Sequence, residues 1–406
     1  MSTIEREPSG KAGGEGCPFV NFDDLNPPES EALWHFDNFD RLRSDSRAYF
    51  GDARGTEFWM LTRIEDIRKA FQAPGTFSSR AVVPADPDPP YMWIPEMLDP
   101  PIHTKWRQLL GPLFSPAAIA ALEPRVRSRF NEILDEVVGT GACDFVDAVA
   151  LRFPNTIFME LMGLPVSDAP QFQVWETDIL HKGGSANEDA LRAMNEVIAY
   201  FGALVAERRK EPRQDIVSIA ATWSIDGEPI SDADLMSLCL LMFMAGLDTV
   251  AMQLSYSFLH LATHDEDRRR IVEDPTLIPG AVEEFLRYYA FVTPGRKITK
   301  DVDFGPCPMK AGQMIFLPIV AANRDPAEFV DADKVIIDRA DNRHIAFGAG
   351  PHRCLGSHLA RQELRIGLEE WHKRIPDYRL TPGVAVREHS GQIGLDNLPL
   401  EWDVPS

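Results

Sequence analysis

The longest continuous pattern in the sequence is helical and runs from about residue 115 to about residue 290. Apolar residues recur there at spacings of three and four, as in residues 116–138, PAAIAALEPRVRSRFNEILDEVV. This spacing places side chains on one face of a helix. Prolines and glycines interrupt the pattern at GLPVSDAP, KEPRQ and EDPTLIPG, where we expect turns. The region therefore predicts a mainly α protein.

The other segments predict a small amount of β structure. Residues 47–63, RAYFGDARGTEFWMLTR, carry two aromatic-rich runs around a glycine-containing turn and predict a β-hairpin. A short helix is expected over residues 64–73, and a last long helix begins near Cys354. The remaining strand-like pieces are residues 313–320, residues 334–340 and a closing hairpin over residues 393–404.

The chain shows no linker, internal repeat or break in composition. Its 406 residues would by length alone favour about three domains. Because no boundary is visible, we expect a single large helical domain with small sheets over residues 31–406. Residues 1–30 are rich in Gly, Pro and Glu and lack periodicity, which predicts a loose tail.

Net charge and cysteine content indicate which partners and which cellular compartment the protein can have. The formal net charge of −21 argues against nucleic acid or an anionic membrane surface as the main partner. The longest apolar run, residues 235–247, is shorter than the roughly 20 residues of a membrane span. The polar N-terminal residues are unlike a signal peptide. Five scattered cysteines without a CxxC pair indicate reduced thiols, so we expect a cytoplasmic protein.

One cysteine has unusual neighbours. Cys354 lies in FGAGPHRCLG, residues 347–356, just where the last helical pattern begins. A helix N-terminus favours a thiolate over a thiol, and Gly348 and Gly350 permit tight turns around it. Phe347 can shield the sulfur from water. A buried packing residue, a nucleophile and a metal ligand all remain as interpretations, and the ten-residue pattern as a whole favours the ligand.

This loop is similar, without a gap, to the haem-ligand loop of the cytochrome P450 superfamily. The matching residues are Phe347, Gly348, Gly350, His352, Cys354, Gly356, Leu359 and Ala360. The resemblance spans nearly the whole chain, and GLDTV, YMWIPEMLDPP and LPLEWD are most similar to the bacterial camphor-hydroxylase-like branch. It implies the cytochrome P450 fold and a haem b (iron protoporphyrin IX) whose iron is axially bound by the Cys354 thiolate.

A second match lies in MAGLDTV, residues 244–250. Ala245 and Gly246 resemble the small residues that leave room for dioxygen over the haem. Asp248 and Thr249 resemble the acid–alcohol pair that relays protons, which is a general-acid task. A carboxylate inside so apolar a segment would be costly to bury without a role or a partner.

A third match is EEFLRYY, where Glu284 and Arg287 stand three residues apart on one helix face. In the family this pair joins an arginine upstream of the cysteine loop, and Arg339 has the matching offset. The resemblance implies that these three residues hold the loop that carries Cys354.

The resemblance also implies donors for the two haem propionates. His103 and Arg107 lie four residues apart in DPPIHTKWRQLL, and Arg296 and His352 match the other donors. Guanidinium groups suit carboxylate oxygens because they donate in a fixed fork. The chain departs from the camphor-hydroxylase-like branch in carrying His103 rather than an acid, and in carrying Pro294 before Gly295.

Family offsets predict a mostly apolar substrate pocket. Its expected lining residues are Tyr91, Trp93, Leu241, Met244, Val292, Thr293 and Ile393. We therefore expect dioxygen-dependent hydroxylation of a small to medium apolar substrate, such as a terpenoid or an aromatic compound. The enzyme is expected to be a monomer.

Electrons are expected from a 2Fe-2S-type ferredoxin with its reductase and NAD(P)H, because the chain carries no flavin or nicotinamide fingerprint. Residues 338–374 hold seven Arg or Lys against five Asp or Glu, which predicts a basic docking patch that includes Arg361. Three alternatives stay open: a peroxide-driven peroxygenase, a non-catalytic haem sensor, and a thiol hydrolase that uses Cys354.

Overall fold

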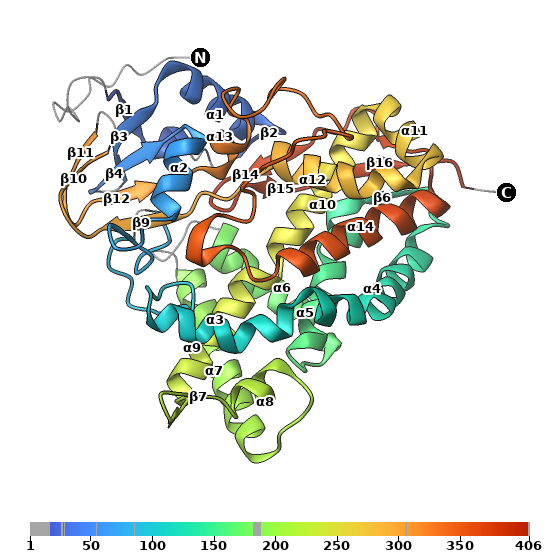
Figure 1. Cartoon of the computed structure of the whole chain (residues 1–406). Coiled ribbons are helices and arrows are strands. Elements are labelled where there is room, and N and C mark those ends of the chain that lie inside the picture. The colour runs from blue at the N-terminus through green and yellow to red at the C-terminus, as the bar shows by residue number, and fades with distance from the viewer. Residues whose placement is uncertain are drawn as a thin grey trace.

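The computed structural model describes residues 17–404, except residues 26, 28, 54, 85, 182–187 and 305–306. Helices make up most of this part of the chain and fill the right and lower parts of Figure 1, while the largest sheet lies at the left. The helices are α1 (Trp34–Asp45), α2 (Ile64–Phe71), α3 (Ile102–Leu110), α4 (Pro116–Val137), α5 (Arg152–Leu161), α6 (Ala169–Glu176), α7 (Glu188–Lys210), α8 (Ile216–Ala220), α9 (Asp232–Gly246), α10 (Asp248–Thr263), α11 (Asp265–Glu273), α12 (Ile278–Tyr288), α13 (Ile319–Asn323) and α14 (Ser357–Arg374).

The strands form one mixed sheet and four small ones. The large sheet has the order β1-β3-β4-β12-β9-β5. Its strands are β1 (Phe19–Asn21), β3 (Ala48–Ala53), β4 (Thr56–Leu61), β12 (Met314–Phe316), β9 (Gly295–Ile298) and β5 (Phe77–Ser78). The small sheets have the orders β10-β11, β13-β16-β6, β15-β14-β2 and β7-β8. Their strands are β2 (Ser30–Glu31), β6 (Ala142–Asp144), β7 (Ser224–Ile225), β8 (Glu228–Pro229), β10 (Val302–Phe304), β11 (Cys307–Met309), β13 (Arg379–Leu380), β14 (Arg387–His389), β15 (Gly394–Leu395) and β16 (Pro399–Glu401).

The expected fold class and several expected elements are confirmed. Strands β3 and β4 form the predicted hairpin, with antiparallel pairs from Ala48↔Leu61 to Ala53↔Thr56. Helix α2 follows directly, as its apolar spacing predicted. Helix α4 begins after Ser115, whose side chain accepts a hydrogen bond from the Ala118 amide, an N-cap that satisfies one free donor of the first turn.

Three local predictions are wrong. Residues 334–340 form turns rather than a strand, because the Ile336 amide donates to the Glu284 carboxylate at 2.8 Å instead of to a neighbouring strand. Residues 313–320 split into β12 and the start of α13, with Pro318 at the boundary. Residues 393–404 are not a hairpin, since β15 pairs with β14 while β16 pairs with β13 and β6.

The predicted loose tail also ends earlier than residue 30. Residues 1–16, 26 and 28 lie outside the described part of the chain. From Phe19 onward, however, β1 pairs in parallel with β3, and Val20 and Leu25 are buried. Burial of these apolar side chains attaches the segment to the sheet.

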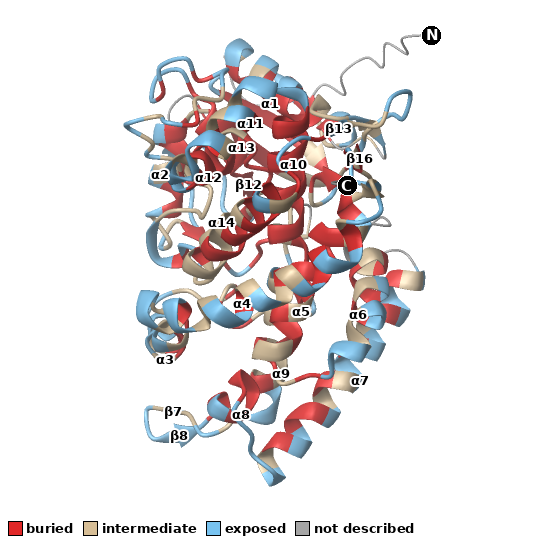
Figure 2. Ribbon diagram, turned by 90° about the vertical axis from the view of Figure 1, so that its right-hand side faces the viewer, coloured by how far each residue is buried: buried red, intermediate tan, exposed pale blue. Residues whose placement is uncertain are grey.

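Helices α9 and α10 form the central element. Nearly every residue of α10 is buried, and Figure 2 shows it surrounded by other elements. Among the described residues, the stretch Asp232–Thr263 is the one helix long and apolar enough to cross a membrane, with 56% of its most apolar window buried. Its apolar side chains pack against the protein's own core, which is the ordinary position of a central helix in a globular fold.

Candidate active site

The loop that carries Cys354 is shaped by two glycines in the left-handed region. Gly348 and Gly350 have φ of 70° and 72°. A Cβ atom at Gly350 would lie 2.6 Å from the Phe71 carbonyl oxygen, so this position requires glycine for space as well as for conformation. The Cys354 amide donates to the Phe347 carbonyl at 2.8 Å, which closes the loop just before α14. Cys354 thus lies three residues before the start of α14, the place in the chain that the helical pattern predicted.

Cys354 is accessible to solvent although protein atoms surround its thiol. Its side chain is exposed, yet burial is the largest influence on its pKa and raises it. The Gly356 amide, Arg107 and Arg353 lower the pKa, but burial outweighs them. The sequence predicted that the helix terminus favours the thiolate. Individual groups do lower the thiol pKa, but the net shift is upward and favours the neutral thiol. A metal ion at this sulfur would supply the missing stabilisation, since coordination deprotonates a thiol.

The central helix is interrupted at the predicted oxygen groove. Helix α9 ends at Gly246 and α10 begins at Asp248; Leu247 between them stays in the right-handed region, with φ of −96° and ψ of −55°, but belongs to neither helix. Ala245 is exposed although it belongs to a buried apolar helix, so it faces open space. The Thr249 hydroxyl donates to the Ala245 carbonyl at 3.2 Å. A Cβ atom at Gly246 would lie 2.7 Å from the Phe158 ring, so packing against α5 already explains this glycine.

Asp248 has an acidic neighbour that the sequence analysis missed. Glu176, the last residue of α6, is buried, and its Oε1 has no hydrogen-bond partner. Burial and then the charge of Asp248, itself fully buried, raise the pKa of Glu176 well above its usual range. An acid within the apolar segment FQVWETDIL was the only signal in the sequence. Burial and the charge of Asp248 together favour the protonated form of Glu176.

Replacement of Glu176 with glutamine should make stability less dependent on pH. The folded-state pKa of Glu176 is raised, so the folded state binds a proton that the unfolded state has already released above about pH 4.5. Stability of the wild type should therefore fall as pH rises, by up to about 1.4 kcal/mol per pH unit. Glu176→Gln should lose this downward slope above about pH 4.5 in urea denaturation. Parallel profiles for the two proteins would contradict the assignment.

The four expected propionate donors come together. The rings of His103, on α3, and His352 lie 3.9 Å apart. Arg107 donates to the Arg353 carbonyl at 2.7 Å, and its charge acts on Cys354. Arg296, on β9, is buried. Burial lowers the pKa of His103 to about 4, so this imidazole is neutral near pH 7.

These groups leave donors available for a ligand. His103 Nδ1 and both ring nitrogens of His352 are buried without a hydrogen-bond partner. Buried polar atoms of this kind are uncommon unless a further group satisfies them. Two guanidinium groups and two imidazoles beside an accessible cysteine fit the two carboxylates and the iron of a haem.

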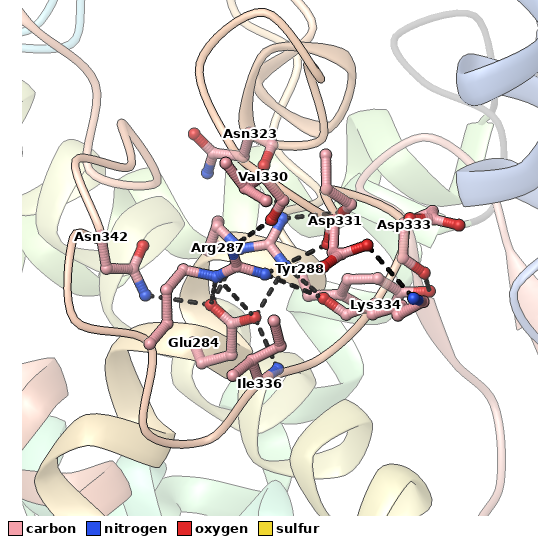
Figure 3. A network of polar contacts seen from close by, with 12 residues as sticks. Glu284, Arg287, Tyr288, Asn323, Val330, Asp331, Asp333, Lys334, Ile336 and Asn342 are labelled. Carbon is pink, nitrogen blue, oxygen red and sulfur yellow. Dashed lines mark hydrogen bonds and ion pairs between the residues drawn. The ribbon is translucent and has the colours of Figure 1, made fainter.

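The expected structural pair is the centre of a buried network (Figure 3). Glu284 and Arg287 are both fully buried and joined by contacts of 2.7 and 2.8 Å. Arg287 also donates to the carbonyls of Asn323, Ala332 and Lys334, at 2.9, 2.9 and 2.7 Å. Arg339 reaches Glu284 at 3.0 Å. The network ties α12 to residues 323–342, the segment that leads into the cysteine loop.

Comparison with known proteins decides the family. The family model described as cytochrome P450 matches residues 52–371. The chain belongs to the cytochrome P450 family. It is 35% identical over 354 residues to the probable cytochrome P450 127A1 of Sinorhizobium fredii, which covers 86% of this chain and 84% of that protein. It is 33% identical to the mycinamicin IV hydroxylase/epoxidase of Micromonospora griseorubida, over 86% and 90% of the two chains.

A solved structure gives the same result for the fold. The crystal structure of CYP101J2 aligns with a TM-score of 0.86 at 27% identity, over 97% of this chain and 100% of that one. The protein is therefore a cytochrome P450 monooxygenase, and its cofactor is haem. It uses dioxygen, an organic substrate and a redox partner.

The residues expected to line the P450 substrate pocket are distributed over four segments. Tyr91 stacks on Trp93 with ring centroids 5.0 Å apart, and its hydroxyl donates to Asp86 at 3.0 Å. Trp93 Nε1 and Thr293 Oγ1 are buried without a hydrogen-bond partner. Leu241 and Met244 lie on α9, and Val292 and Thr293 precede β9. Ile393 belongs to the main hydrophobic cluster, so core packing is sufficient to explain it.

The expected basic patch is largely neutralised. Arg361 forms two contacts with Glu283, at 2.6 and 2.9 Å, and lies 4.5 Å from the Phe347 ring centroid. Arg365 is paired with Glu123 and Glu369, each at 2.8 Å. Arg361 thus fastens the cysteine loop to α12, and its replacement would test loop stability rather than docking. Arg353 remains as an exposed cation next to Cys354.

Proposed function

We propose that this P450 hydroxylates a C–H bond of a small to medium apolar substrate of terpenoid or aromatic type. The observation that carries the proposal is the apolar character of the expected pocket residues, with Tyr91 already bonded to Asp86. Pockets for apolar ligands are lined in this way, with few polar groups to fix orientation. The relatives include a mycinamicin IV hydroxylase/epoxidase, whose name is consistent with C–H oxidation.

We further propose that a 2Fe-2S ferredoxin supplies the electrons, through its reductase from NAD(P)H, to a soluble, cytoplasmic monomer. Arg353 and the loop before α14 would form the contact, because an exposed cation adjoins the iron ligand there. The pairing of Arg361 and Arg365 within the protein reduces the contribution of the wider patch.

The chain's own residues perform distinct tasks in this reaction. Arg107, Arg296, His103 and His352 would bind the propionates, and Cys354 would hold the iron. The bound haem supplies the activation of dioxygen, to which the thiolate ligand contributes electron density. Thr249 and Asp248 stand at the helix break beside Ala245, where they can hold and pass protons. The buried core around α10 excludes bulk water.

A substrate screen tests the proposal. Holoprotein would be titrated with terpenoids, aromatics and polar controls while the haem absorption band is followed. We expect a spectral shift with apolar compounds, and product formation with ferredoxin, reductase, NAD(P)H and dioxygen. Turnover supported only by hydrogen peroxide would instead identify a peroxygenase. Binding without consumption of reducing equivalents would identify a sensor.

Replacement of Cys354 with serine should abolish the thiolate signature. The reduced, carbon-monoxide-treated wild type should show a red-shifted band, because thiolate ligation alters the haem spectrum. Cys354→Ser should lose that band and its monooxygenase turnover. Cys143→Ser, a half-buried cysteine on β6, is the matched control and should keep both. Loss of activity in Cys354→Ser without any change in the visible spectrum would instead support a thiol hydrolase.

A further inference from the structure

Glu96 is an anion among the groups that bind the propionates. Its Oε1 lies 3.4 Å from Arg296 Nη2, and its Oε2 lies 3.6 Å from His352 Nδ1. Both distances exceed the 2.7–2.9 Å of a strong charge-assisted hydrogen bond. Glu96 therefore holds these two groups loosely, and its side chain is 31% exposed. The sequence did not predict a role for this residue.

The charge of Glu96 influences the iron ligand and three of the groups that were expected to bind the propionates. It acts in the direction that raises the pKa of Arg107, Arg296, His103 and the Cys354 thiol. Burial raises the pKa of Glu96 itself, but His352, Arg296 and His103 outweigh burial and hold the pKa below its usual range. Glu96 is thus ionised near neutral pH, close to both the propionate donors and the iron ligand.

With haem bound, three carboxylates would share these donors: the two propionates and Glu96. The two propionates need the same guanidinium and imidazole groups that Glu96 now contacts. Arg107 and Arg296 provide two permanent positive charges, and His103 is neutral near pH 7. Like charges in a partly buried site repel one another more strongly than in water.

We propose that Glu96 is a competing carboxylate at the propionate site, whose negative charge loosens haem retention and lowers the haem reduction potential. The second effect follows because ferric haem carries one more positive charge than ferrous haem, so a nearby anion favours the ferric state. Glu96 acts through its charge and takes no part in proton transfer or substrate binding.

The test compares wild-type holoprotein with Glu96→Gln. Midpoint potentials would be measured by spectroelectrochemistry, and haem release by transfer to excess apomyoglobin. Glu96→Gln should raise the potential, on the order of a tenfold change in the ferric-to-ferrous equilibrium, which corresponds to 59 mV for one electron. It should also slow haem release. Glu96→Asp keeps the charge and should behave like the wild type.

Glu401→Gln is the matched charge control. Glu401 lies on β16, pairs with Arg379 at 2.7 Å and has a similarly exposed side chain, 26%. Its replacement should change neither quantity. Faster haem release from Glu96→Gln, or a potential within error of the Glu401→Gln control, would overturn the proposal. The first result would show that Glu96 only holds Arg296 and His352 in place.

Discussion

Replacement of Arg287 with alanine is expected to prevent accumulation of folded haem protein, or to lower the free energy of unfolding by about 3–5 kcal/mol. Glu284, which is fully buried like Arg287, would lose its buried partner and keep Arg339 as its one remaining cation among the described contacts. The carbonyls of Asn323, Ala332 and Lys334 would lose the donor they now share. Leaving buried groups unsatisfied accounts for much of this cost.

Urea denaturation followed by circular dichroism measures the effect, together with the fraction of protein that shows the red-shifted carbon monoxide band. Arg270→Ala is the matched control. Arg270 pairs with Asp338 at 2.8 Å, but the side chains are 38% and 50% exposed. Removing that surface pair should cost no more than about 1 kcal/mol. Equal losses in the two variants would show that the network does not stabilise the cysteine loop.

The features that could be predicted from the sequence are those set by neighbours in the chain. The cysteine loop depends on glycines within a few residues of Cys354, and the hairpin of β3 and β4 depends on its own alternating pattern. Glu284 and Arg287 meet because a helix brings residues three apart onto one face. The break between α9 and α10 lies within the GLDTV motif, residues 246–250.

The features that were missed depend on partners far away in the chain. Glu96 meets Arg296 only after β9 and the segment before α3 are brought together by the fold. Residues 334–340 have the composition of a strand, but Glu284 takes the Ile336 amide. Arg361 was expected at a docking surface, yet Glu283 of α12 neutralises it. A cluster of basic residues in the sequence therefore predicts a basic docking surface only when acidic side chains from other elements do not pair with them.

Replacement of Asp248 with asparagine should lower turnover by about 10²–10⁴-fold, the usual contribution of a positioned proton donor or acceptor. Asparagine keeps the size and polarity of the side chain but cannot take up or release a proton. Asp248 is fully buried at the first residue of α10, next to Thr249 at the helix break. The loss should therefore appear in turnover and in a larger solvent isotope effect, while substrate-induced spectral shifts stay unchanged.

Two further variants separate proton delivery from folding. Asp265→Asn alters the first residue of α11, an aspartate that is 71% exposed, and should leave turnover unchanged. Thr249→Ala should consume electrons at the wild-type rate. A larger share of those electrons should end in hydrogen peroxide rather than in product, because the Thr249 hydroxyl no longer orients the proton. If Asp248→Asn turned over within about threefold of the wild type, the proton path would have to avoid Asp248. Because the charge of Asp248 acts on Glu176 at the end of α6, a double replacement would then show whether the Glu176 carboxyl carries the proton instead.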